Sequence, residues 1–142
     1  MKVPFAACCE TVLQDVRTNN LSLINLIDEV QAVAFPIVMQ KLCFVAIVDR
    51  TLEEPSTSQA RLVGTLNGKE VFSFEAPLDF QGRTSTRTIG EFQGVLIQAP
   101  GRLLLSLQRQ EEVLAAVTVE IKNIGNPQAE LFAGSGSSRQ PQ

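Results

Sequence analysis

The chain has 142 residues, with 12 Lys and Arg against 15 Asp and Glu, and a formal net charge of −3. Hydrophobic residues make up 44% and charged residues 19%, a composition typical of a globular domain rather than a disordered or fibrous chain. The sequence contains no His, Tyr or Trp, which excludes Ser-His-Asp and Cys-His catalysis and zinc sites that use imidazole. The slight acidity, without a long Lys or Arg run, argues against nucleic acid as a partner.

Three cysteines, Cys8, Cys9 and Cys43, are too few and odd in number for a disulfide framework. Cys8 and Cys9 are adjacent in a predicted strand, so their side chains point to opposite faces. We expect buried reduced thiols that pack as small apolar residues. A redox or metal role stays open, the metal role being weaker because structural zinc needs four ligands. We predict no cofactor and no metal.

The amino-terminal residues 1–4 are followed by no apolar signal core. The longest uncharged apolar runs, 32–39 and 42–48, are far shorter than the roughly 20 residues of a membrane span. We therefore expect a soluble cytoplasmic protein that does not bind membranes.

The first half of the chain shows period-2 alternation broken by turn residues. Residues 5–15 are predicted to form a strand, closed by a turn at 17–20. Residues 21–30 fit a strand or a short helix behind an Asn20 cap, and we predict a strand because the flanking segments are strand-like. Residues 42–48 are apolar on both faces, which predicts a strand covered on both sides, and 49–60 is a polar loop.

The second half holds two predicted hairpins. Asn67-Gly68 separates the β-rich runs 61–66 and 69–75, and this dipeptide is the strongest short hairpin signal because both turn positions need positive φ. The second hairpin pairs 102–108 with 113–121, burying Leu103, Leu105 and Leu107. Between the hairpins we predict two strands, 83–89 and 92–99, followed by a Pro100-Gly101 turn.

These elements total eight or nine strands, which predicts an all-β, two-sheet antiparallel β-sandwich over residues 1–122. Residues 123–142 shift to Gly, Ser, Pro and Gln, and we predict a flexible tail.

The order of elements resembles an uncharacterised family of small bacterial β-sandwich domains of unknown function. The resemblance rests on the apolar pattern of 21–30, on Phe35-Pro36, on 42–50 and on Pro100-Gly101 before the last hairpin, and covers residues 5 to 121. It implies a β-sandwich and no assigned activity or site.

The most unusual polar strand is 83–87. In extended form Arg83, Ser85 and Arg87 share one face, so two planar guanidinium groups with a hydroxyl between them suit a carboxylate or phosphate. The alternative is an exposed strand whose charges discourage edge-to-edge pairing. Among the eight Phe residues, we expect core packing for Phe44, Phe72 and Phe74, and partial exposure for Phe35, Phe80 and Phe92.

Leu131 and Phe132 are apolar residues in a polar tail. They dock back on the sandwich, extend its last sheet, or bind a partner as a short motif.

No constellation at catalytic spacing emerges. The sequence predicts a non-catalytic protein-interaction or structural module that binds a protein partner or self-associates through a strand edge. The alternatives are a sandwich that binds a small anionic ligand through Arg83 and Arg87, and an enzyme that uses carboxylates or a cysteine.

Overall fold

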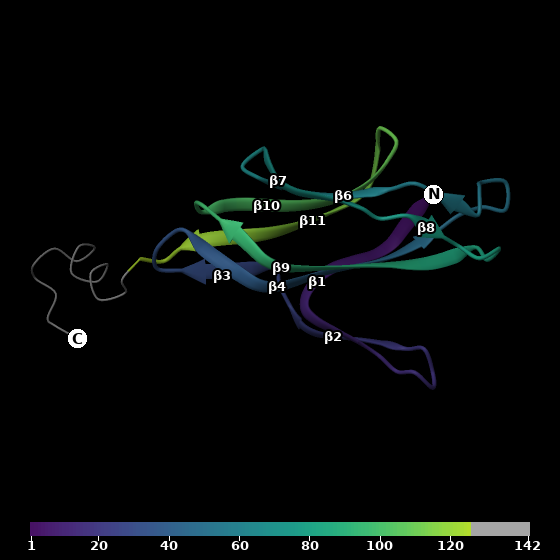
Figure 1. Ribbon diagram of the computed structural model, residues 1–142, viewed down its shortest axis with the longest axis horizontal. Coiled ribbons are helices and arrows are strands. Elements are labelled where there is room, and N and C mark those ends of the chain that lie inside the picture. Colours follow the sequence, from purple (N-terminus) through teal and green to yellow (C-terminus); the bar gives the residue numbers. More distant parts are fainter. Residues whose placement is uncertain (126–142) are drawn as a thin grey trace, which may run out of the picture.

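The computed structural model describes residues 1–125. In that range the chain forms eleven β-strands and no helix. The strands are β1 (Lys2–Gln14), β2 (Leu21–Leu26), β3 (Glu29–Ala32), β4 (Ile37–Asp49), β5 (Thr57–Ser58), β6 (Arg61–Leu66), β7 (Lys69–Glu75), β8 (Leu78–Asp79), β9 (Ser85–Ile97), β10 (Gly101–Arg109) and β11 (Glu112–Asn123). Figure 1 shows them in two layers, with the N-terminus and the end of β11 on opposite sides of the molecule.

Nine strands form the two main sheets. The first sheet has the order β2-β1-β4-β9 and the second has the order β3-β11-β10-β6-β7, while β5 and β8 form a small separate pair. Neighbouring strands are antiparallel except β3 and β11, which run parallel. The predicted two-sheet β-sandwich is therefore confirmed, with one parallel pair that the apolar pattern did not indicate.

The core lies between the two sheets and is built from alternate residues of each strand. The predicted apolar face of β10, Leu103, Leu105 and Leu107, is 0% exposed. It packs with Phe44 and Leu42 of β4 in one continuous cluster of buried residues. Each of these side chains contributes about 1.5–3 kcal/mol by leaving water.

Both faces of β4 are covered in its central part, as the sequence of 42–48 predicts. Every residue from Leu42 to Ala46 is buried. Leu42, Phe44 and Ala46 point into the sandwich, whereas Cys43 and Val45 belong to a separate outer group of buried residues. We call this outer group, completed by Cys9 and the packed side chains of Val12, Leu21 and Leu23, the second cluster.

The second cluster exists because the hairpin of β1 and β2 folds over the outer face of the first sheet. The amino-terminal part of β1 pairs with β4 up to Cys9, and the rest pairs with β2. Figure 1 shows β2 and the hairpin turn on the side of β4 and β9 that faces away from the second sheet. Val12 and Leu23 are opposite each other in it and both pack toward Cys43 and Val45.

Both predicted hairpins of the second sheet are confirmed. β6 and β7 are joined by Asn67 and Gly68, whose φ angles of 51° and 85° are the left-handed values that this turn needs. β10 and β11 are joined across Gln110 and Glu111. Strand β11 ends at Asn123, one residue beyond the predicted domain boundary, and the Ile124 N–H donates to the Ala32 carbonyl over 2.9 Å.

The prediction of strand rather than helix for residues 21–30 is confirmed, but the segment is not one strand: it is divided between two strands in different sheets. β2 ends at Leu26 after Asn25, whose φ is 57°, and β3 begins at Glu29. Between them the Ile27 N–H donates to the Cys8 carbonyl, and the Asp28 carbonyl accepts from the Glu120 N–H. Residues 27 and 28 therefore carry the chain from the first sheet to the second.

The prediction of two strands at 83–89 and 92–99 is wrong, because Ser85–Ile97 is one strand of 13 residues. The alternation looked broken at Gly90, which has no side chain. Gly90 nevertheless pairs with Phe44 and points inward, where a Cβ atom would lie 3.2 Å from both Leu62 and Phe92. Those neighbours fill the space, so the strand continues.

The described residues contain no helix that is long and apolar enough to span a membrane.

Candidate functional site

The strand β9 carries Ser85 and Arg87, two of the three predicted site residues, and is an edge strand of the first sheet. Its ladder with β4 places Arg87 opposite Ile47, Ile89 opposite Val45 and Glu91 opposite Cys43. Since Cys43 and Val45 belong to the second cluster, the side chains of Arg87, Ile89 and Glu91 lie on the outer face of the sheet.

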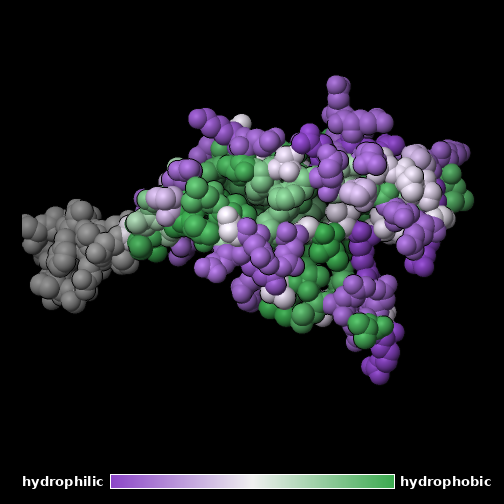
Figure 2. Space-filling model, viewed as in Figure 1, coloured by the Kyte–Doolittle hydropathy of each residue, from purple (hydrophilic) through white to green (hydrophobic). Residues whose placement is uncertain are grey.

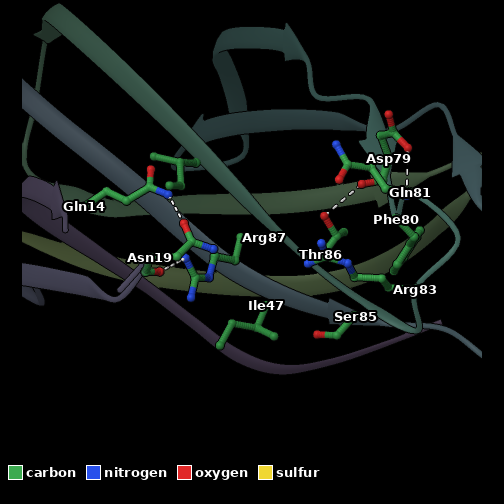
Figure 3. Close-up of a pocket in the computed structure, with 11 residues that line it drawn as sticks. Gln14, Asn19, Ile47, Asp79, Phe80, Gln81, Arg83, Ser85, Thr86 and Arg87 are labelled. Atoms are coloured by element: carbon green, nitrogen blue, oxygen red, sulfur yellow. Dashed lines mark hydrogen bonds between the residues drawn. The ribbon is translucent and has the colours of Figure 1, made fainter. Parts of the chain in front are cut away.

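The beginning of β9 borders an open polar pocket of about 500 Å³, between the sheet, the tip of the β1–β2 hairpin and the loop after β8. Figure 3 shows Arg87 beside Asn19 on one side of this pocket and Arg83 beside Thr86 on the other. The lining residues are Gln14, Asn19, Ile47, Asp79, Phe80, Gln81, Arg83, Ser85, Thr86, Arg87 and Ile89. All three predicted ligand-binding residues therefore line one pocket.

Arg83 reaches the pocket from a turn rather than from the strand. Gln81 and Gly82 adopt positive φ angles of 52° and 77°, and the Arg83 N–H closes the turn on the Phe80 carbonyl. The prediction that Arg83, Ser85 and Arg87 share one face of a single extended strand thus holds only for Ser85 and Arg87. A glutamine in the left-handed region is rare, so its residue type gave no signal for this turn.

Arg50 holds this turn in place. Its Nε donates to the Arg83 carbonyl over 2.7 Å, its Nη1 donates to the Glu54 carbonyl over 2.8 Å, and its guanidinium lies 5.4 Å from the Phe80 ring centroid. Phe80 is 1% exposed. The expectation that Phe80 and Phe92 are partly exposed is wrong, because both are buried in the core. The expectation of core packing for Phe74 is also wrong, because Phe74 is 48% exposed.

The pocket is richer in positive charge than the chain as a whole. Within residues 1–125, neither Arg83 nor Arg87 has a carboxylate within 4.0 Å. The Arg87 Nη1 donates to the Asn19 carbonyl over 2.7 Å, which also ties the hairpin tip to β9. Among the described residues, Asp79 is the only acidic one that lines the pocket, and its Oδ1 accepts the Gln81 N–H.

A second feature lies along the open edge of the sandwich, where β7 and β9 are the edge strands of the two sheets. Two adjoining hollows of about 590 and 370 Å³ form a groove between them, and both are lined by Phe74, Glu91 and Phe92. The Phe74 ring centroid lies 4.8 Å from that of Phe92, and that of Phe72 lies 4.6 Å from it. Figure 2 shows hydrophobic side chains reaching the surface between polar ones on this elongated molecule.

The outer edge of β9 has no strand partner in the part of the chain that the structure describes. One row of its backbone N–H and C=O groups faces away from β4, as in every edge strand. The sequence suggested self-association through a strand edge but did not identify which strand, because edge position depends on the order of strands in the sheet.

The three thiols are free and buried, as predicted. Burial, with smaller contributions from Cys9 and Cys43, raises the pKa of Cys8 to about 12. Burial also raises the pKa of Cys9 and of Cys43, which are opposite each other in the β1–β4 ladder. Residues 1–125 contain no group of three or more Cys, Asp or Glu side chains placed to hold a metal ion. Leu131 and Phe132 lie outside the described residues.

The fold and this edge define a small all-β sandwich domain with an open edge strand, β9. Residues 4–122 match the model of a family of unknown function, DUF6941. The match covers most of the chain, so the protein belongs to this family, in agreement with the expected membership in an uncharacterised domain family. No curated protein matches the chain.

Proposed function

We propose that this chain is a non-catalytic protein-interaction module that binds through the β9 edge. The observation that carries the proposal is the 13-residue edge strand beside a groove lined by Phe72, Phe74 and Phe92. An extended segment added to such an edge gains backbone hydrogen bonds, and adjacent pockets select its side chains. This mode of binding needs no special residues, which accords with a chain that has no His, Tyr or Trp.

The proposal includes a cytoplasmic setting in a bacterium. Cys9 and Cys43 are direct cross-strand neighbours and both are free thiols, a state that a reducing compartment maintains. The bacterial source follows from the resemblance given by the sequence.

The test is site-specific photo-crosslinking in the cells that make the protein. A photoreactive residue replaces Gln93, which is exposed on β9, and a matched control replaces Ser22, which is exposed on β2 at the far edge of the same sheet. We expect protein adducts from position 93 that disappear when Ile89→Lys is added, and none from position 22. Equal yields at both positions, or adducts that survive Ile89→Lys, would contradict an interaction edge at β9.

A second candidate function is binding of a small anionic ligand in the pocket at the beginning of β9. It is supported by two arginines without carboxylate partners among residues 1–125, lining one pocket with the Ser85 hydroxyl and several side-chain amides. Charge-assisted bonds from guanidinium groups suit carboxylate or phosphate oxygens.

Titration with inorganic phosphate and with acetate, followed by NMR of the arginine Nε–H signals, tests this candidate. We expect Arg83→Ala to weaken binding about tenfold, since charged hydrogen bonds contribute roughly 1.5–3 kcal/mol. The Arg83 side chain makes no hydrogen bond within the described residues, so the melting temperature should not fall. Unchanged affinity in this variant would leave the pocket as a solvated surface.

A further inference from the structure

The outer face of the β9 edge carries a symmetric pattern of charge around one apolar residue. Arg87 and Glu91 flank Ile89 at equal distances along the strand, and all three side chains lie on the same face. Ile89 is 44% exposed. The regular part of the strand, from Ser85 to Gln93, is also centred on Ile89, because Gly94 has a φ of 69° and kinks the chain.

We infer that the partner of this edge is a second copy of the chain, paired antiparallel through β9 about a two-fold axis at Ile89. This inference rests on the proposed function. In this register Ile89 is opposite Ile89 of the second copy, and Arg87 is opposite its Glu91. The same pair recurs on the other side of the axis, as an isologous interface requires. Opposite charges directly across two strands are favourable.

The charges select this register over its neighbours. Sliding one strand by two residues along the other, in either direction, places Arg87 opposite Ile89 or Gln93 of the second copy and removes the Arg87–Glu91 pairs. Sliding by four residues places Arg87 opposite Arg87 of the second copy, or Glu91 opposite its Glu91. Like charges directly opposite each other are destabilising. The charges on β9 therefore favour one antiparallel pairing, whereas the sequence alone left open that they discourage edge pairing.

Both charged groups have capacity for the new contact. Arg87 uses one of its five N–H donors on the Asn19 carbonyl. The Glu91 Oε1 accepts from Gln93 Nε2 over 3.3 Å and lies 3.8 Å from Lys41 Nζ, while Oε2 has no hydrogen bond to residues 1–125. Lys41 also contributes positive charge on this face, but it belongs to β4, one strand away from the edge.

On its inner face, the same pairing would cover part of the groove beside Phe74 and Phe92. Gly90 and Phe92 point inward, and in this register they are opposite Thr88 and Thr86 of the second copy. A strand added to β9 therefore extends the sheet that carries Phe92, whose ring packs against Phe74 of β7. The first sheets of the two copies would join into one continuous sheet of eight strands, since each contributes four.

Sedimentation velocity of the full chain over a concentration series tests this inference. We expect a monomer–dimer equilibrium that weakens with added salt. Arg87→Glu and Glu91→Arg should each weaken the dimer about tenfold, since each places like charges together twice. The double variant, Arg87→Glu with Glu91→Arg, should recover most of the loss because the pairs re-form with reversed sign.

Arg102→Glu is the matched control, because it reverses one member of an exposed ion pair of 2.8 Å on the second sheet. It should leave the dimer unchanged. A chain that stays monomeric at every concentration, or a double variant no better than the single ones, would overturn the inference. If a monomeric chain still gives adducts with another protein from position 93, the self-pairing fails while the interaction module stands; if those adducts are missing as well, both fail.

Discussion

Asn67 and Gly101 lie against each other where the chain passes from the first sheet into β10. The Asn67 Nδ2 donates to the Pro100 carbonyl over 3.0 Å, and its Oδ1 accepts the Arg102 N–H over 3.3 Å. Gly101 has a φ of 148°, and a Cβ atom there would lie 1.9 Å from Asn67 Oδ1. One side chain in the β6–β7 turn thus fixes a second turn far away in the sequence.

Gly101→Ala should destabilise the domain by about 1–3 kcal/mol, because the added methyl displaces the Asn67 side chain and strains the backbone. Urea denaturation at equilibrium measures the change. In an Asn67→Gly background the colliding oxygen is missing, so Gly101→Ala should cost less there, and the cycle isolates the contact. An equal cost in both backgrounds would attribute the whole effect to the backbone angle.

At the scale of elements, the sequence predicted strands best where side chains alternate without interruption. β10 and the β6–β7 hairpin follow directly from the leucine spacing and from Asn67-Gly68. The pattern failed at Gly90, where neighbouring side chains supply the missing inward contact, and at Gln81, which takes a backbone angle typical of glycine.

The candidate site was also predictable only where it depends on the alternation of side chains along a strand. Ser85 and Arg87 share a face because strand periodicity requires it, and the sequence identified both. The contributions of Asn19 and Gln14 depend on the β1–β2 hairpin folding over the sheet, which no local pattern specifies. The open edge likewise depends on the strand order, a property of long-range pairing.

The β1–β2 hairpin is held on the sheet by the second cluster and by the bond from Arg87 to Asn19. Leu23→Ala should therefore loosen the hairpin, at a cost of about 1–2 kcal/mol for a half-buried leucine. Limited digestion with trypsin detects this, because Arg17 is exposed in the hairpin turn. Cleavage after Arg17 should accelerate more than cleavage elsewhere.

Leu105→Ala is the control for that experiment. Leu105 is 0% exposed in the main core, so its loss should cost about 2–5 kcal/mol and accelerate cleavage at all sites together. If Leu23→Ala accelerated every site equally, the hairpin and the sandwich would unfold as one unit.

On the scale of the whole molecule, the domain consists of a shared core, a hairpin packed on one outer face and an open edge on one side. All three cysteines are free and buried, so no disulfide links the strands of this domain. Cys8 lies in the core between the two sheets, so its proton is exposed to solvent only when the sandwich opens. Ionisation of the Cys8 thiol is therefore linked to unfolding of the whole domain rather than to a local change.

The free energy of unfolding should decrease as the pH rises from about 9 toward 12. The pKa of Cys8 is raised from 9.0 to about 12, chiefly by burial. Below pH 9 both states keep the proton and the thiol has no effect; above it the unfolded chain loses the proton while the folded chain retains it. This difference favours unfolding by about 1 kcal/mol for each pH unit. Urea denaturation across this pH range, compared with Cys8→Val, measures the contribution: the variant should show the shallower decline, and identical slopes would show that Cys8 ionises as easily in the folded domain as in the unfolded chain.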